Sequence, residues 1–251
     1  MKKNTVFIVL LLALSFTSCM TEKHNFPVEK EYWDVNDYDK AILDLRFTYE
    51  DNETKPTLDH PEQRIIVEKL TNPQNFKIIL DDNKLDFNQR NKIASEFISH
   101  WKDMNQIYNV TESGKYVYGK EMLAVWQFGL ELQLAAFDLQ FDEILAKSDN
   151  PEDEKVKKRV NASMKKLIDN YGNYLNLITN EDAFYEKEKE EYAKGIDTYF
   201  KQLIQVYPDA DYDRLLNKAN AMLKKTRSAT IKKSLKRLID QINTLNNKDE
   251  A

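Results

Sequence analysis

The sequence predicts an all-α protein, a multi-helix bundle of about eight or nine helices. Only five glycines and six prolines occur in its 251 residues, whereas β architectures with many turns need these residues at their bends. Beyond residue 33, apolar residues recur at helical intervals, and no segment shows convincing period-two alternation. The spacing therefore favours helices throughout the region after residue 33.

The first half of this region contains a series of helix-start signals. Asp34 can cap a helix that runs to about Tyr49. Further starts follow at Asp59 with Pro61, at Asn72-Pro73 and at Asp86. The last of these opens a longer helix in which Ile93, Phe97 and Trp101 recur every four residues, so we expect these side chains to share one face.

The segment from about Lys115 to Lys147 is apolar on almost every side, which is typical of a helix surrounded by other helices. A membrane span is the competing interpretation. However, Glu121, Glu131 and Asp138 lie inside the segment, and no uncharged stretch reaches about 18 residues. We therefore expect the central helix of a bundle here.

Three later start signals complete the bundle. The run Asn150-Pro151-Glu152-Asp153-Glu154 combines a capping residue, an early proline and three acids, and a subdivision of the domain near 149–151 is one alternative. The helix from Tyr185 to Val206 alternates three- and four-residue spacings, as a packing seam does. Asp211 and Ser228 then start the last two helices.

A patch in the C-terminal part resembles the second helix of a tetratricopeptide repeat. Its residues are Tyr192-Ala193, Ile196, Tyr199-Phe200 and the run from Leu203 to Pro208. The resemblance covers about 17 residues, and no second copy follows at the 34-residue offset of that family. It implies a short helical-repeat-like C-terminal part, and the alternative is an amphipathic helix that Pro208 ends.

The N-terminus has the features of a targeting segment. Lys2 and Lys3 precede a short apolar run from Val6 to Leu14, and small residues then lead into Cys19. This pattern resembles the lipobox of bacterial lipoproteins, in which cleavage precedes the cysteine and the cysteine becomes lipid-modified, for example with palmitate. The alternative is an ordinary secretory peptide with an incidental cysteine.

The lipoprotein resemblance implies a domain plan and a location. Residues 1–18 would be the signal peptide, 19–32 a lipidated flexible tether, and 33–251 the all-helical domain. In that family, an aspartate after the cysteine retains many members at the inner membrane, but this position is Met20. The resemblance therefore implies a lipid-anchored, outer-membrane protein that faces the periplasm, with the cell surface as the alternative.

The sequence gives little support for a metal site or a cofactor. Helical di-iron sites use two Glu-x-x-His motifs, and the chain has none. Glu96 and His100 form a single pair four residues apart, which we interpret as a solvent-side or cap-like contact. Asp209-x-Asp211-x-Asp213 begins like a calcium loop but lacks the required glycine, so helix capping is the simpler interpretation.

Catalysis is equally hard to support. There is no G-x-S-x-G elbow, no Walker loop and no dinucleotide fingerprint, and the one cysteine is assigned to the lipid. We therefore expect no enzyme activity and no cofactor.

Charge is distributed unevenly along the chain, although the totals of 37 Lys+Arg and 42 Asp+Glu are close. The segment from Arg214 to Ile239 contains no acid. Its nine basic residues are Arg214, Lys218, Lys224, Lys225, Arg227, Lys232, Lys233, Lys236 and Arg237. Residues 31–62, in contrast, hold ten acids: Glu31, Asp34, Asp37, Asp39, Asp44, Glu50, Asp51, Glu53, Asp59 and Glu62.

Three interpretations of the basic hairpin 214–239 stay open. The acidic and basic ends neutralise each other across the fold, or both are solvated faces. Alternatively, the hairpin binds an acidic protein partner or an anionic envelope surface. Nucleic acid fits poorly with an exported, net-acidic chain.

The sequence thus predicts a lipid-anchored envelope protein with a non-catalytic binding or scaffolding role. The leading hypothesis is an accessory subunit of an envelope or secretion assembly that uses the basic hairpin. One alternative is a lipoprotein that binds a glycan or small ligand, which would require an exposed aromatic cleft. Another is an immunity-type lipoprotein that binds a toxin or inhibitor through the acidic residues near 31–62.

Overall fold

The structure, a computed structural model, describes residues 26–50, 55–148 and 153–249 and confirms an all-α, multi-helix bundle. The α-helices are α2 (Val35–Glu50), α3 (Pro61–Leu70), α4 (Gln74–Leu80), α5 (Phe87–Tyr108), α6 (Gly119–Ala146), α7 (Glu154–Leu175), α8 (Glu186–Gly195), α9 (Lys201–Val206), α10 (Asp213–Lys225) and α11 (Ala229–Asp249). The remaining elements are a 3-10 helix η1 (Asn176–Ala183), a π-helical turn η2 (Ile196–Phe200) and strands β1 (Thr111–Glu112) and β2 (Lys115–Tyr116).

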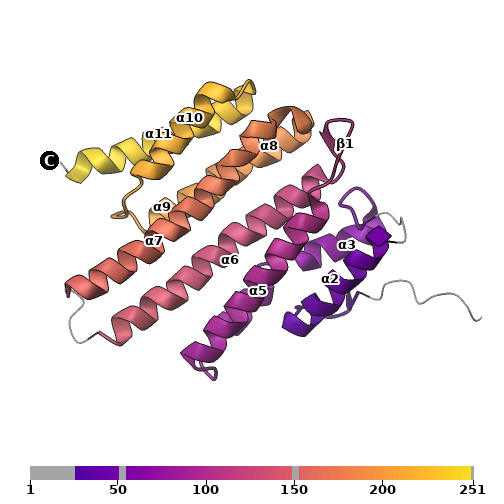
Figure 1. Ribbon diagram of the computed structural model, residues 1–251, viewed down its shortest axis with the longest axis horizontal. Helices are drawn as coiled ribbons and strands as arrows, with labels where there is room; N and C mark the ends of the chain where they lie inside the picture. Colours follow the sequence, from indigo (N-terminus) through magenta and orange to yellow (C-terminus); the bar gives the residue numbers. More distant parts are fainter. Residues whose placement is uncertain (1–25, 51–54, 149–152, 250–251) are drawn as a thin grey trace, which may run out of the picture.

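The helices lie side by side as a layered stack (Figure 1). The α2–α3 part forms one end, α5 and α6 follow, and α7 with α8 and α9 comes next, before α10 and α11 at the other end. In this stack α10 packs on α7, while α11 packs on α8 and η2. The C-terminal hairpin therefore rests on the α7–α9 helix pair rather than on the N-terminal helices.

Helix α6 is the centre of the bundle, as the apolar segment predicted. It contacts α4, α5, α7 and α8, and about half of its residues are buried. The acids inside it have specific partners. Glu121 accepts a hydrogen bond from the backbone N–H of Leu58 (2.6 Å), and Glu131 pairs with Lys77 (2.7 Å). No helix in the described ranges is long and apolar enough to cross a membrane.

Local capping explains why several helices begin where the sequence predicted. Asp34 and Asp37 each accept a hydrogen bond from the other's backbone N–H, and Asp86 and Gln89 form a full capping box. At the α7 start, Asp153 accepts from the N–H of Lys155 (2.7 Å). The predicted cap at Asn150 and the subdivision near 149–151 lie outside the described residues.

The prediction that the central helix begins near Lys115 is wrong by one turn. Lys115 lies on β2, which pairs antiparallel with β1, and α6 begins at Gly119. The turn between the two strands takes left-handed φ angles at Ser113 (50°) and Gly114 (78°), which a helix does not allow. The strands have two residues each, too few for a period-two pattern to show in the sequence.

The described part of the predicted 19–32 tether is packed onto the bundle. Phe26 is buried and its ring lies parallel to the fully buried indole of Trp33 (6.5 Å between centroids). Trp33 Nε1 donates to the carbonyl of Pro27 (2.9 Å), and the Lys69 ammonium donates to the carbonyl of Glu31 (2.9 Å). A flexible tether is therefore an expectation for residues 19–25 alone, which lie outside the described ranges.

Buried tyrosine hydroxyls join different helices. Five of them donate to a backbone carbonyl elsewhere in the fold, and burial raises the pKa of each of these five. The bonds are Tyr38 to Leu70 (2.6 Å), Tyr108 to Pro56 (3.1 Å), Tyr171 to Leu130 (3.1 Å), Tyr174 to Tyr192 (3.2 Å) and Tyr192 to Tyr174 (3.2 Å). The last two are reciprocal, and their rings stack at 4.8 Å.

Two glycines allow especially close packing. A Cβ on Gly129 of α6 would overlap the indole of Trp101 on α5, and a Cβ on Gly195 would overlap the phenol of Tyr174. Gly195 directly precedes the π turn η2, so the helix widens where the Tyr174 ring approaches its backbone. Because glycine has no Cβ, these two positions allow the neighbouring side chains to approach the helix backbone closely.

We predict that Gly129→Ala destabilises the protein by about 1–3 kcal/mol, because the added methyl group forces α5 and α6 apart. The matched control is Gly172→Ala on α7, where the nearest atom, Lys218 Cδ, is 4.0 Å from the new methyl. We expect this control to be neutral or to stabilise by up to about 1 kcal/mol, because alanine favours helix. Chemical denaturation measures both, and equal effects of the two substitutions would contradict the prediction.

Candidate functional site

The predicted basic hairpin is α10, the turn 226–228 and the first turns of α11. Its three arginines are all paired with aspartates of the neighbouring layer. The pairs are Arg214 with Asp169 on α7, Arg227 with Asp182 on η1, and Arg237 with Asp197 on η2. The Asp197 carboxylate hydrogen-bonds the Arg237 guanidinium and raises its pKa. Part of the predicted basic surface thus serves to attach the hairpin to the bundle.

The acids of residues 31–62 do not supply these pairs. In the described part of that segment, Asp37 pairs with Lys30 (2.6 Å) and Asp59 pairs with Lys120. These acids lie with α2 and α3, at the opposite end of the stack from α10 and α11 (Figure 1). For the described acids of this segment, the interpretation that the two predicted charge clusters neutralise each other is therefore wrong, because the helices between them keep them apart.

The six lysines of the hairpin differ from its arginines, because no side-chain hydrogen bond or ion pair joins the ammonium group of any of them to another described residue. We call them the lysine cluster: Lys218, Lys224, Lys225, Lys232, Lys233 and Lys236. Five are exposed, and Lys218 is half-buried beside Gly172. The cluster flanks the 226–228 turn, with members on the last turns of α10 and the first turns of α11.

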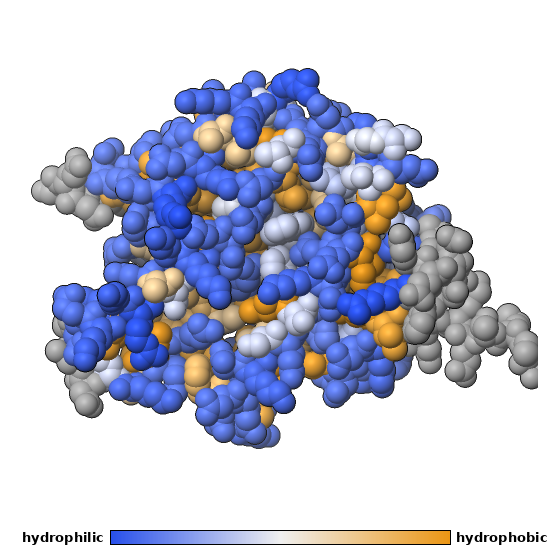
Figure 2. All heavy atoms as spheres, in the orientation of Figure 1, coloured by the Kyte–Doolittle hydropathy of each residue, from blue (hydrophilic) through white to orange (hydrophobic). Residues whose placement is uncertain are grey.

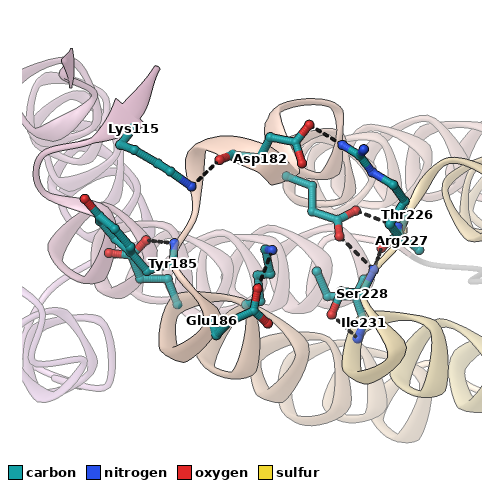
Figure 3. Close-up of polar contacts among 11 residues, drawn as sticks. Lys115, Asp182, Tyr185, Glu186, Thr226, Arg227, Ser228 and Ile231 are labelled. Carbon is teal, nitrogen blue, oxygen red and sulfur yellow. Dashed lines mark hydrogen bonds and ion pairs between the residues drawn. The ribbon is translucent and has the colours of Figure 1, made fainter. Parts of the chain in front are cut away.

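A buried carboxylate fixes the turn between these lysines. Glu181 of η1 accepts the backbone N–H of Arg227 (3.0 Å) with one oxygen and that of Ser228 (2.7 Å) with the other (Figure 3). These N–H groups lie at the start of α11, where a negative charge also interacts favourably with the helix dipole. Ser228 Oγ accepts from the N–H of Ile231 (3.4 Å), which confirms the predicted helix start.

The β1–β2 hairpin is tied to the same corner (Figure 3). The Lys115 ammonium donates to the carbonyl of Asp182 (2.7 Å) and lies over the ring of Tyr185 at 5.2 Å. Asp182 in turn pairs through its carboxylate with Arg227. One chain of contacts therefore runs from β2 through η1 to the turn between α10 and α11, and it gives the lysine cluster a rigid base.

The two helices that carry the lysine cluster, α10 and α11, have no large exposed apolar side chain among their described residues. In the described residues such side chains are Tyr32, Leu43, Ile65, Ile78, Val117, Tyr185 and Val206, and none is on α10 or α11. The space-filling view shows this rim, at the top, as mostly hydrophilic (Figure 2).

The interpretation of His100 as a solvent-side group is wrong. It is 8% exposed, its ring stacks on Tyr38 at 5.8 Å, and burial lowers its pKa despite nearby acids. The nearest acid is Asp39, whose Oδ1 lies 3.4 Å from Nε2. The spacing of Phe97, His100 and Met104 contains the signal for burial, because these positions follow one face of a helix.

Clefts of moderate size occur in the described structure, and one of about 590 Å³ lies between α2, α4 and α5. It is lined by Asp34, Val35, Asn36, Asp39, Ile79, Lys92, Ile93, Glu96, Ser99 and His100. No group of three or more His, Cys, Asp or Glu side chains in the described ranges could hold a metal ion. Of the suspected calcium loop, Asp211 accepts the N–H of Asp213 (3.0 Å), which is a capping contact.

The other site residue that the sequence predicts, Cys19, lies outside the described residues. The exposed tyrosines, Tyr32 and Tyr185, come from separate parts of the fold. Comparison of the chain with family models, curated proteins and solved structures gives no match.

We predict that Glu181→Ala destabilises the hairpin by about 1–3 kcal/mol, because two backbone N–H groups lose their acceptor. Glu181→Gln keeps one acceptor oxygen, so a smaller loss is expected. Hydrogen exchange at the start of α11 and chemical denaturation measure the effects. Glu190→Ala, which removes an exposed acid from α8, is the control. The prediction fails if the Glu181 and Glu190 variants exchange at the same rate.

Proposed function

We propose that this protein is a lipid-anchored envelope protein with a non-catalytic binding or scaffolding role. It is attached through Cys19 to the outer membrane, on the periplasmic side, and acts as an accessory subunit of an envelope or secretion assembly. The lysine cluster is its contact with an anionic partner, either an acidic protein or an anionic envelope surface. Neither a cofactor nor a metal ion is needed for this role.

The observation that carries the proposal is that the arginines and the lysines of the hairpin differ in their contacts. The three arginines bind aspartates of the chain itself, while the six lysines have no partner among the described residues. The ion pairs between the hairpin and the rest of the described chain therefore use the arginines and not the lysines. A surface of this kind attracts anionic partners over distances comparable to the Debye length, about 8–10 Å at ordinary ionic strength.

The lipid anchor is tested by Cys19→Ala. We expect the wild-type chain to incorporate a palmitate analogue and to fractionate with membranes, because each buried methylene contributes about 0.8 kcal/mol. The variant should incorporate none. Mass spectrometry establishes whether its N-terminal segment has been cleaved, so that an uncleaved leader is not mistaken for an anchor. Equal incorporation by both chains would contradict the anchor.

The lysine cluster is tested by reversing Lys224, Lys232 and Lys236 to Glu together. All three are exposed, so the fold should be unaffected, with stability changes within about 0.5 kcal/mol per site. We expect in-cell cross-linking to envelope components to fall roughly tenfold or more, because each reversal replaces attraction with repulsion.

The control for this experiment reverses three exposed lysines elsewhere, Lys84, Lys102 and Lys187, which gives the same net charge. Arg214, Arg227 and Arg237 stay unchanged in both variants because they attach the hairpin to the bundle. If both variants lose cross-linking equally, net charge rather than the lysine cluster is responsible, and the proposed contact surface is wrong.

A further inference from the structure

We propose that the lysine cluster binds the anionic lipid headgroups of the membrane that carries the Cys19 anchor. The protein is then held at this membrane in two places, by its lipid and by the C-terminal hairpin. This inference rests on the lipid anchor of the proposed function and names the partner of the same surface.

The chemistry of the surface favours a lipid layer over a folded protein. Stable protein interfaces bury a few aromatic or aliphatic anchors in a dry centre, and charges without such anchors contribute mainly to the rate of association. Among the described residues, α10 and α11 expose no large apolar side chain. Tyr185, which lies on a different element, stays exposed and has the Lys115 ammonium over its ring at 5.2 Å. A partner that binds α10 and α11 would therefore contact mainly charged side chains.

The identity of the free cations points the same way. Guanidinium groups bind carboxylates in a fixed, two-pronged geometry, which Arg237 adopts on Asp197, and Arg214 and Arg227 also bind aspartates within the chain. An ammonium on a flexible stem is a point charge with no preferred partner geometry. An array of such charges suits headgroups that move in the plane of a membrane better than the fixed carboxylates of a folded surface.

The anchor makes such contacts effective even when each is weak. Only the six residues 20–25 separate Cys19 from the packed Phe26, a distance of at most about 25 Å when extended. Phe26 packs on Trp33 directly before α2, at the opposite end of the stack from α10 and α11, so the lysine cluster reaches the same membrane when the stack lies along the lipid surface (Figure 1). In that orientation the short connection keeps the local concentration of headgroups high. A single acyl chain gives marginal binding, and a basic patch is a known second signal for stable attachment.

The test uses the full, lipidated chain reconstituted in two kinds of vesicle. One contains phosphatidylcholine alone, and the other contains phosphatidylcholine with about one third phosphatidylglycerol as the anionic component. Because Cys19 is the only cysteine and carries the lipid, an introduced cysteine is the sole free thiol. Thr230→Cys places a nitroxide on α11 beside the lysine cluster, and Asn88→Cys places it on α5 as a control; both positions are exposed.

The measurement is the collision of each nitroxide with a nickel-chelating headgroup lipid. We expect collisions at position 230 in anionic vesicles, few in neutral vesicles, and few at position 88 in either. High salt should abolish the effect, because the Debye length falls to about 3 Å at 1 M. Reversal of Lys224, Lys232 and Lys236 should weaken the contact by roughly a hundredfold or more, since each lysine near such a surface contributes about a factor of five and each reversal also adds repulsion.

Other outcomes would contradict the headgroup site, the choice of partner or the lipid anchor. Equal collisions in neutral and anionic vesicles would show apolar contact and reject the headgroup site. No collisions in anionic vesicles, with lysine-dependent cross-linking retained in cells, would identify an acidic protein as the partner. Failure of the wild-type chain to float with neutral vesicles would reject the anchor of the proposed function. Binding to anionic vesicles alone would then support the lysine site independently.

Discussion

The need of five buried tyrosine hydroxyls for an acceptor constrains how the helices of this protein fit together. A phenol buried without a partner costs about 1–3 kcal/mol, so each tyrosine restricts the rotation and the axial shift of two elements at once. Tyr38 fixes the end of α3 against α2, and the reciprocal bonds of Tyr174 and Tyr192 fix α7 against α8. Gly195 and the π turn after it then make room for the Tyr174 ring.

The C-terminal hairpin depends on this arrangement because its attachment points lie on the elements that the tyrosines position. Asp169 is on α7, while Glu181 is on η1, which leads from α7 to α8. Asp197 is in the π turn itself. The register of α7 against α8 therefore decides where these acids meet the hairpin, and with it where the lysine cluster is presented. The packing of α7 against α8 in the interior therefore determines where the charged side chains of the hairpin lie on the surface.

Helix class, most helix starts and the central position of α6 followed from the sequence because they depend on local capping and on the period of apolar residues. The start at Asp86 is an example, since its capping box lies within four residues. The β1–β2 hairpin, η1 and the π turn did not follow, because contacts distant in the chain hold them. For the candidate site, the sequence located the basic residues correctly. It did not reveal which were already paired, because Asp169, Asp182 and Asp197 lie 40 to 45 residues away.

The separate roles of arginine and lysine on the hairpin also bear on how this surface would change over generations. An arginine bound to an aspartate on another helix is constrained in both partners, so loss of one favours a compensating change in the other. A lysine that contributes only charge is free to move to a neighbouring exposed position, provided that the total is kept. Related chains would then share the three attachment pairs, while the free lysines drift along α10 and α11 without loss of the surface.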